Sequence, residues 1–144
     1  MIEQDTIRLL RECDAGVKMG VSSIDDVLKY VKDEKLKVIL EDNKKDHKKL
    51  DTELQELLDK YKDEGKDPNP MAKGMSWLKT NMKLYMDNSD ATIADLLTDG
   101  CDMGIKSLYR YLNQYKDAEQ EATSIAKRLI DIEAKLETEL RKYL

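Results

Sequence analysis

Hydrophobic positions recur at three- and four-residue steps in four long stretches of the chain. This spacing is typical of a helix that buries one face. The stretches predict helices at about 6–31, 34–63, 90–115 and 119–143. Very short connections join the first helix to the second and the third to the fourth, so each pair is expected to form an antiparallel hairpin.

Polar residues mark where several of these helices begin and end. Asp5, Asp33 and Ser89 are candidate N-caps, because each precedes a periodic stretch and carries a side-chain oxygen. Residues 62–70, KDEGKDPNP, interrupt the pattern with one glycine and two prolines. A shorter amphipathic stretch at 71–86 carries several methionines on one face and predicts a helical crossover between the two hairpins.

Two pairs of similar segments indicate an internal repeat. CDAGVK at 13–18 matches CDMGIK at 101–106, and KLDTEL at 49–54 matches KLETEL at 135–140. The matches occur in the same order and at nearly the same separation. They predict a duplicated helical hairpin, with convergent Lys/Glu/Leu-rich helical composition as the alternative.

The composition is typical of a helical protein, and the length of the chain suits a single domain. The chain has 144 residues, of which 38% are charged and 6% aromatic, with no phenylalanine and two prolines. We expect one all-α domain over 1–144, with hairpins at about 5–63 and 89–144 and the crossover at 64–88.

Charge and hydropathy exclude several classes of partner. The net charge is −5, and both signs are interspersed, so no basic patch favours nucleic acid. No apolar run reaches the length of a membrane span, and no secretory signal is visible at the N-terminus. We therefore expect a cytoplasmic protein with reduced cysteines. Self-association is also expected, because helical bundles commonly dimerise, although the sequence identifies neither a surface nor a protein partner.

The order of the elements resembles that of a known class of bundle. The segments MAKGMSWLKTNMKL and IADLLTDGCDMGIKSLYRYLNQY are similar to the uncharacterised ferritin-like four-helix-bundle family, classed as a domain of unknown function. The resemblance covers most of the chain and rests on pattern and spacing. It implies a ferritin-like fold, made of two hairpins joined by a long crossover, and it implies no known activity.

The chain departs from the usual di-iron pattern of ferritin-like proteins. That pattern needs a Glu-x-x-His motif on each of two helices. The second helix offers Lys44-x-x-His47, with a cation in place of the carboxylate, and the fourth offers Ile130-x-x-Glu133. A standard di-iron centre is therefore not expected.

A different set of residues could hold a metal. Cys13, His47, Cys101 and Glu133 each lie on the inner face of a different predicted helix, and these residue types bind tetrahedral zinc or iron. The positions of these residues along the bundle axis argue against a site with all four ligands. Cys13 and His47 are misaligned along that axis by about one helical turn, roughly 5 Å. The structural alternative has two buried thiols and a core histidine bonded to Asn43 or an acidic neighbour. A disulfide between the cysteines is the third option.

The sequence supports three functional hypotheses. The leading one is a non-catalytic helical protein that acts by association or as a scaffold, because no catalytic constellation or phosphate-binding loop is present in the sequence. The alternative is a metal-binding bundle that uses the inner Cys/His/Glu set, with a redox-linked role as one option. The third is a pocket for a small apolar ligand between the first and third helices, beside Gly16 and Gly104.

Overall fold

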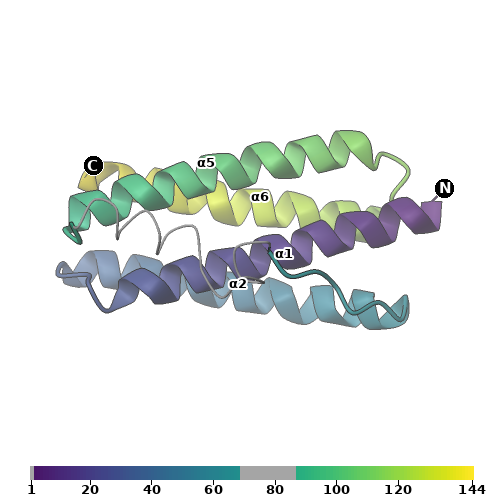
Figure 1. Cartoon of the computed structure of the whole chain (residues 1–144), viewed down its shortest axis with the longest axis horizontal. Helices are drawn as coiled ribbons and strands as arrows, with labels where there is room; N and C mark the ends of the chain where they lie inside the picture. Colours follow the sequence, from purple (N-terminus) through teal and green to yellow (C-terminus); the bar gives the residue numbers. More distant parts are fainter. Residues whose placement is uncertain (1, 69–86) are drawn as a thin grey trace.

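Four long helices make up the part of the chain that the structure describes. The computed structural model describes residues 2–68 and 87–144, and all regular structure in these ranges is helical. The helices are α1 (Ile2–Leu28), α2 (Glu34–Lys60), α5 (Asp90–Gln114) and α6 (Gln120–Leu140), with a final 3-10 turn η1 (Arg141–Tyr143) (Figure 1). The all-α prediction is confirmed for these two ranges. The expected crossover helix at 71–86 lies outside the described residues.

Two of the three predicted N-caps are confirmed. The Asp33 carboxylate accepts the N–H of Leu36 at 2.9 Å, and the Ser89 hydroxyl accepts the N–H of Thr92 at 3.2 Å. Such caps satisfy N–H groups that have no partner within the helix. The starts of α2 and α5 are therefore predicted correctly from the local sequence alone.

The prediction for Asp5 is wrong. Helix α1 already begins at Ile2, and Asp5 lies within its first turn. Its carboxylate accepts the backbone N–H of Asp117 at 3.1 Å, in the turn before α6. Asp5 therefore joins two distant segments, a role that local sequence cannot reveal.

Contacts between the turns establish how the hairpins are arranged. The backbone N–H groups of Lys32 and Asp33, before α2, donate to the carboxylate of Asp90 at 2.9 and 3.0 Å. At the opposite end, the N–H of Glu119 donates to the hydroxyl of Thr6 at 2.8 Å. Helices α2 and α5 thus begin at one end of the bundle, and α1 and α6 begin at the other (Figure 1). The connection from α2 to α5 joins opposite ends, unlike that of a simple up-down-up-down bundle.

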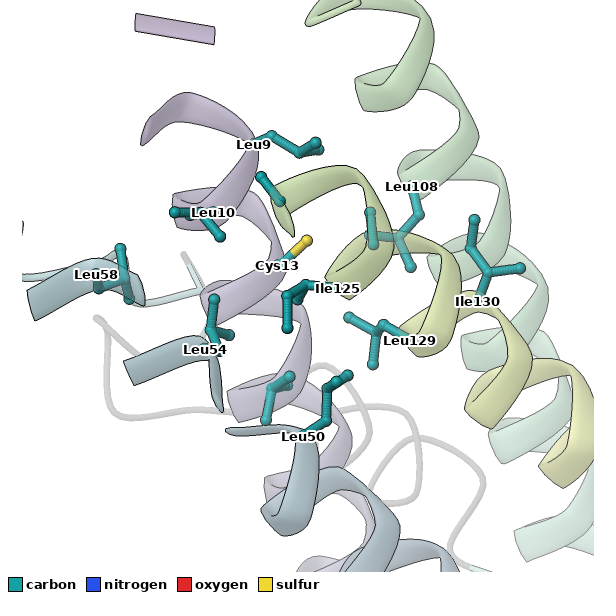
Figure 2. Packing of buried hydrophobic residues seen from close by; sticks show 13 residues of the cluster. Leu9, Leu10, Cys13, Leu50, Leu54, Leu58, Leu108, Ile125, Leu129 and Ile130 are labelled. Atoms are coloured by element: carbon teal, nitrogen blue, oxygen red, sulfur yellow. The ribbon is translucent and has the colours of Figure 1, made fainter. Parts of the chain in front are cut away.

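The apolar core consists of two clusters stacked along the bundle. The first gathers near the start of α1 and includes Leu10, Cys13, Leu54 and Ile125 (Figure 2). The second surrounds the turn between α1 and α2, and its members are Ile24, Val27, Leu36, Leu40, Ile93, Ala94, Leu96, Leu97, Cys101, Leu136 and Leu140. Both clusters draw on all four helices, and burial of their side chains provides the main driving force for folding.

The three- and four-residue spacing of the last helix predicts Ile132 and Leu144 on its inner face, and the structure corrects both. Ile130 is buried, whereas Ile132 is only partly buried at the edge of the first cluster. Leu144, expected to continue the face, is exposed because α6 ends at Leu140 and the chain enters the 3-10 turn. The change of helical type shifts the direction of the last side chains.

A buried carboxylate holds the segment that follows α2. Asp14 is fully buried, and its oxygens accept from the Gln55 side chain, the Lys66 backbone and the Lys18 ammonium, each at 2.9 Å. Gly65 passes next to this carboxylate with φ +84°, which favours glycine. Its position off the inner face of α1 predicts that Asp14 reaches the rim or pairs with Lys18, four residues later. The pair is confirmed, and the segment after α2 covers Asp14, so this residue is not at the rim.

Candidate functional site: a polar layer beside a cavity

A polar layer separates the two apolar clusters, and we define it as Asn43, His47 and Glu133. His47, on α2, has no exposed surface, as its position on the inner face predicts. Its Nδ1 lies 3.0 Å from the backbone oxygen of Asn43, one turn earlier, and its Nε2 lies 3.0 Å from Oε1 of Glu133 on α6. The expectation of a buried and hydrogen-bonded histidine is confirmed.

Asn43 joins the polar layer to α6 by a second contact. Its side-chain nitrogen donates to the backbone oxygen of Ile132 at 3.1 Å. Its side-chain oxygen is buried and has no hydrogen-bond partner among the described residues. Leaving such an acceptor unsatisfied costs about 1–3 kcal/mol, so this layer is less stabilising than an apolar one of equal volume.

A glycine on α1 makes room for the imidazole. A Cβ atom at Gly20 would overlap the His47 ring, with Cδ2 only 2.8 Å away. Only glycine lets the backbone of α1 approach this ring so closely. Gly20 therefore serves the close approach of two helices.

Hydrogen bonding defines the charge at the layer. The Asn43 carbonyl can only accept, so Nδ1 of His47 carries a proton and donates it. Burial alone lowers the pKa of His47, but the hydrogen bond and charge of Glu133, together with the Asn43 carbonyl, outweigh it and raise the pKa. His47 and Glu133 thus favour a buried imidazolium–carboxylate pair, with Nε2 as the second donor.

Cys101 also borders this pair. Burial, followed by the charge of Glu133 and a side-chain hydrogen bond to it, raises the pKa of Cys101 far above its usual range. Cys13 lies in the first apolar cluster, where burial raises its pKa to about 12. Both cysteines are free, so the disulfide option is not realised, and both are held as thiols.

The four predicted metal ligands are only partly brought together. Glu133 contacts His47 and shares a cavity wall with Cys101, whereas Cys13 lies in the first cluster, in line with the expected misalignment. Both nitrogens of His47 are already hydrogen-bonded, and no three His, Cys, Asp or Glu side chains in residues 2–68 and 87–144 converge on one point. The arrangement does not fit zinc or iron, and metal binding stays an untested prediction of the sequence.

A cavity of about 370 Å³ lies between α1 and α5, beside the polar layer. His47 and Glu133 form part of its wall, together with Cys101. Most of the remaining wall is apolar and comes from α1, α5 and α6, including Met19, Ile24, Leu97, Met103, Leu129 and Leu136. We call this space the α1–α5 cavity. It occupies the position predicted for a pocket, because Gly16 and Gly104 both line it.

Gly100 and Gly104 keep the α5 side of the cavity open. A Cβ at Gly100 would meet nothing within 4 Å among the described residues, and one at Gly104 would lie 3.7 Å from Oε2 of Glu133. A glycine within a helix costs about 1 kcal/mol relative to alanine, and neither position needs it for packing against the described chain. The two glycines thus reduce helix stability and enlarge the cavity.

Sequence reasoning missed the part played by Gly100. The available signal was spacing, because Gly16 and Gly20 are four residues apart, as are Gly100 and Gly104, and each pair shares one helix face. The repeat aligns Gly16 with Gly104. A glycine that both copies of the repeat share, with a second glycine one turn away on the same face, therefore indicates a space between those helices.

Comparisons with protein families, with curated proteins and with solved structures find no match to this chain. None of the helices in residues 2–68 and 87–144 has the length and apolar character needed to cross a membrane. Any function assigned to this chain therefore rests on its own geometry.

Proposed function

We propose that this chain is a non-catalytic helical binding protein whose α1–α5 cavity holds a small, mostly apolar molecule. The observation that carries the proposal is the cavity of about 370 Å³, with apolar walls and a buried ion pair on one side. Ligand sites in proteins are typically about 300–1,000 Å³, apolar, and supplied with a few oriented polar groups. The proposal keeps the non-catalytic part of the leading hypothesis and takes its site from the third hypothesis, the pocket beside Gly16 and Gly104.

The chemistry of the wall supports binding over catalysis. A general base needs a free nitrogen or oxygen of suitable pKa, but both nitrogens of His47 are used within the protein. A nucleophilic cysteine needs a lowered pKa, whereas that of Cys101 is raised. These groups are suited to orient a bound molecule and poorly suited to transform it.

We further propose that the fold is of the ferritin-like type and arose by duplication of one hairpin. The connection between opposite ends of the bundle supports the first point. For the second, residues that the repeat makes equivalent occupy related places. Gly16 and Gly104 both line the cavity, and His47 pairs with its own equivalent, Glu133. Such a meeting of equivalent positions is expected on the axis that relates two copies of a hairpin.

Filling the cavity tests the proposed function. Gly104→Leu should place a side chain in the space, abolish binding of 1-naphthylmethanol, and leave the protein folded because leucine favours helix more than glycine does. Lys106→Leu, on the exposed face of α5, is the matched control and should retain binding. Calorimetric titration measures both. Undiminished binding by the Gly104→Leu variant would contradict the proposed site.

A further inference from the structure

The polar part of the cavity wall presents a hydrogen-bond acceptor. Oε1 of Glu133 is bonded to His47, whereas Oε2 lies on the side of Gly104, 3.7 Å from where a Cβ of that glycine would be. Since both residues line the cavity, Oε2 is the carboxylate oxygen that a molecule in the cavity would meet. An ionised carboxylate only accepts hydrogen bonds.

Among the described residues that line the cavity, the charged hydrogen-bond donors are already paired within the protein. Both N–H groups of His47 are directed at protein oxygens, and Cys101 lies in the same wall of the cavity as Glu133. At the rim, the Lys66 ammonium is paired with Glu12 at 2.6 Å, so its charge is balanced. Ser23 and Ser107, which also line the cavity, carry hydroxyls that donate or accept equally well.

We infer that the ligand of the α1–α5 cavity is an apolar molecule with a hydrogen-bond-donating head, an amine or an alcohol, that binds Oε2 of Glu133. The inference rests on the proposed function and gives its ligand a chemical class. A carboxylate head is disfavoured, because it would bring an anion to Oε2 and lose its own water, with no unpaired cation among the described lining residues to balance its charge.

The size of the cavity limits the apolar part. An engineered cavity of about 150 Å³ in another protein holds one benzene molecule, so this space suits a bicyclic ring system or an alkyl chain of similar volume. Met19 and Met103 contribute flexible, polarizable side chains to the wall, and these contact aromatic rings favourably. A naphthalene ring with a one-carbon head group matches both requirements.

Three probes of nearly equal shape test the head group. They are 1-naphthylmethylamine, 1-naphthylmethanol and 1-naphthoate, each titrated into the full-length protein by calorimetry at pH 7. We expect the amine and the alcohol to bind at least tenfold more tightly than the carboxylate. Glu133→Gln should reduce the preference of amine over carboxylate to less than threefold, because an amide replaces the charged acceptor. Gly104→Leu should abolish binding of all three.

The outcomes separate this inference from the proposed function. Equal affinity for the three probes, or tightest binding of the carboxylate, would overturn the donor-head inference and leave the binding function in place. Failure of every probe to bind the wild type would mean that the space is already filled in the folded chain, and it would overturn both. If circular dichroism shows that Glu133→Gln does not fold, Glu133→Asp serves instead. The Glu133→Asp variant keeps the negative charge, but its side chain is one methylene group shorter, so its oxygens lie farther from the ligand. It should weaken amine binding at least threefold.

Discussion

At the scale of single residues, His47 is fully buried and is contacted from three helices. Its ring lies between a glycine of α1, a carbonyl of its own helix and a carboxylate of α6. A simple core histidine would be replaceable by leucine without loss. Here its partner Glu133 is also mostly buried, with 12% of its side chain exposed, so the two residues have to be considered together.

Replacing only His47 should lower the unfolding free energy more than replacing both His47 and Glu133. His47→Leu leaves the Glu133 carboxylate without its nitrogen partner, and we expect a loss of roughly 3 kcal/mol in unfolding free energy. The double variant His47→Leu/Glu133→Leu should recover most of this loss. Urea unfolding of both variants measures the difference. Additive destabilisation in the double variant would show that the pair is not coupled.

The same samples test the metal hypothesis from the sequence. A bound ion would contribute folding free energy, so a chelator would lower the thermal midpoint of the wild type but not that of the variants. Because both His47 nitrogens are hydrogen-bonded within the protein, we expect the wild-type midpoint to be unchanged by chelator. Elemental analysis of protein purified without chelator provides an independent measurement.

The raised pKa of His47 predicts a definite dependence of stability on pH. In the unfolded chain an imidazole has its usual pKa of about 6.5. Since the folded state binds the proton more tightly, the stabilisation is fully present below about pH 6.5 and is lost as pH rises through the folded pKa. Urea unfolding of the wild type should therefore show a falling free energy across this range. His47 is the only histidine, so the double variant should lack this fall. If the unfolding free energy falls equally in the wild type and the double variant as pH rises, groups other than His47 cause the fall.

At the scale of the helices, glycines with the same sequence signal have opposite roles. Gly20 lies against a ring on the neighbouring helix, whereas Gly100 borders open space. Helix propensity treats the two alike, because it describes only the helix itself. What distinguishes them is the presence or absence of another helix's side chain at the position of the missing Cβ.

Matched alanine substitutions should reveal this difference. Gly20→Ala should lower the unfolding free energy by roughly 2 kcal/mol or more, because its Cβ overlaps His47 and either the ring or α1 must shift. Gly100→Ala should raise it by about 0.5–1 kcal/mol, since the Cβ meets nothing within 4 Å and alanine favours helix. Chemical denaturation measures both. A destabilised Gly100→Ala protein would indicate that the space beside Gly100 is filled.

At the scale of the whole molecule, the two apolar clusters and the polar layer form one continuous interior with a cavity along one side. All four helices meet at the depth of this layer, because Gly20 of α1 lies against His47 on α2 and Gly104 of α5 lies near Glu133 on α6. A polar layer between apolar layers favours one alignment of the helices over a shifted one, because a shift would bury its charges against apolar side chains. The layer therefore helps to set the register of the bundle as well as the wall of the cavity.

The sequence by itself determined the helical class, the four long helices and two of their caps. These features depend on interactions within about one turn, which spacing and residue type record directly. It also determined that His47 faces the interior, and the repeated segments indicated that Gly16 and Gly104 occupy related positions.

Only the tertiary structure decided which interior groups meet. His47 pairs with Glu133, 86 positions away, while Cys13 lies in another layer, because the turns set the depth of each helix along the bundle. Asp5 and Asp14, which appear local in sequence, hold distant segments in place. Such contacts depend on how whole helices are shifted and rotated against one another, and helical periodicity records the direction of a side chain but not its partner.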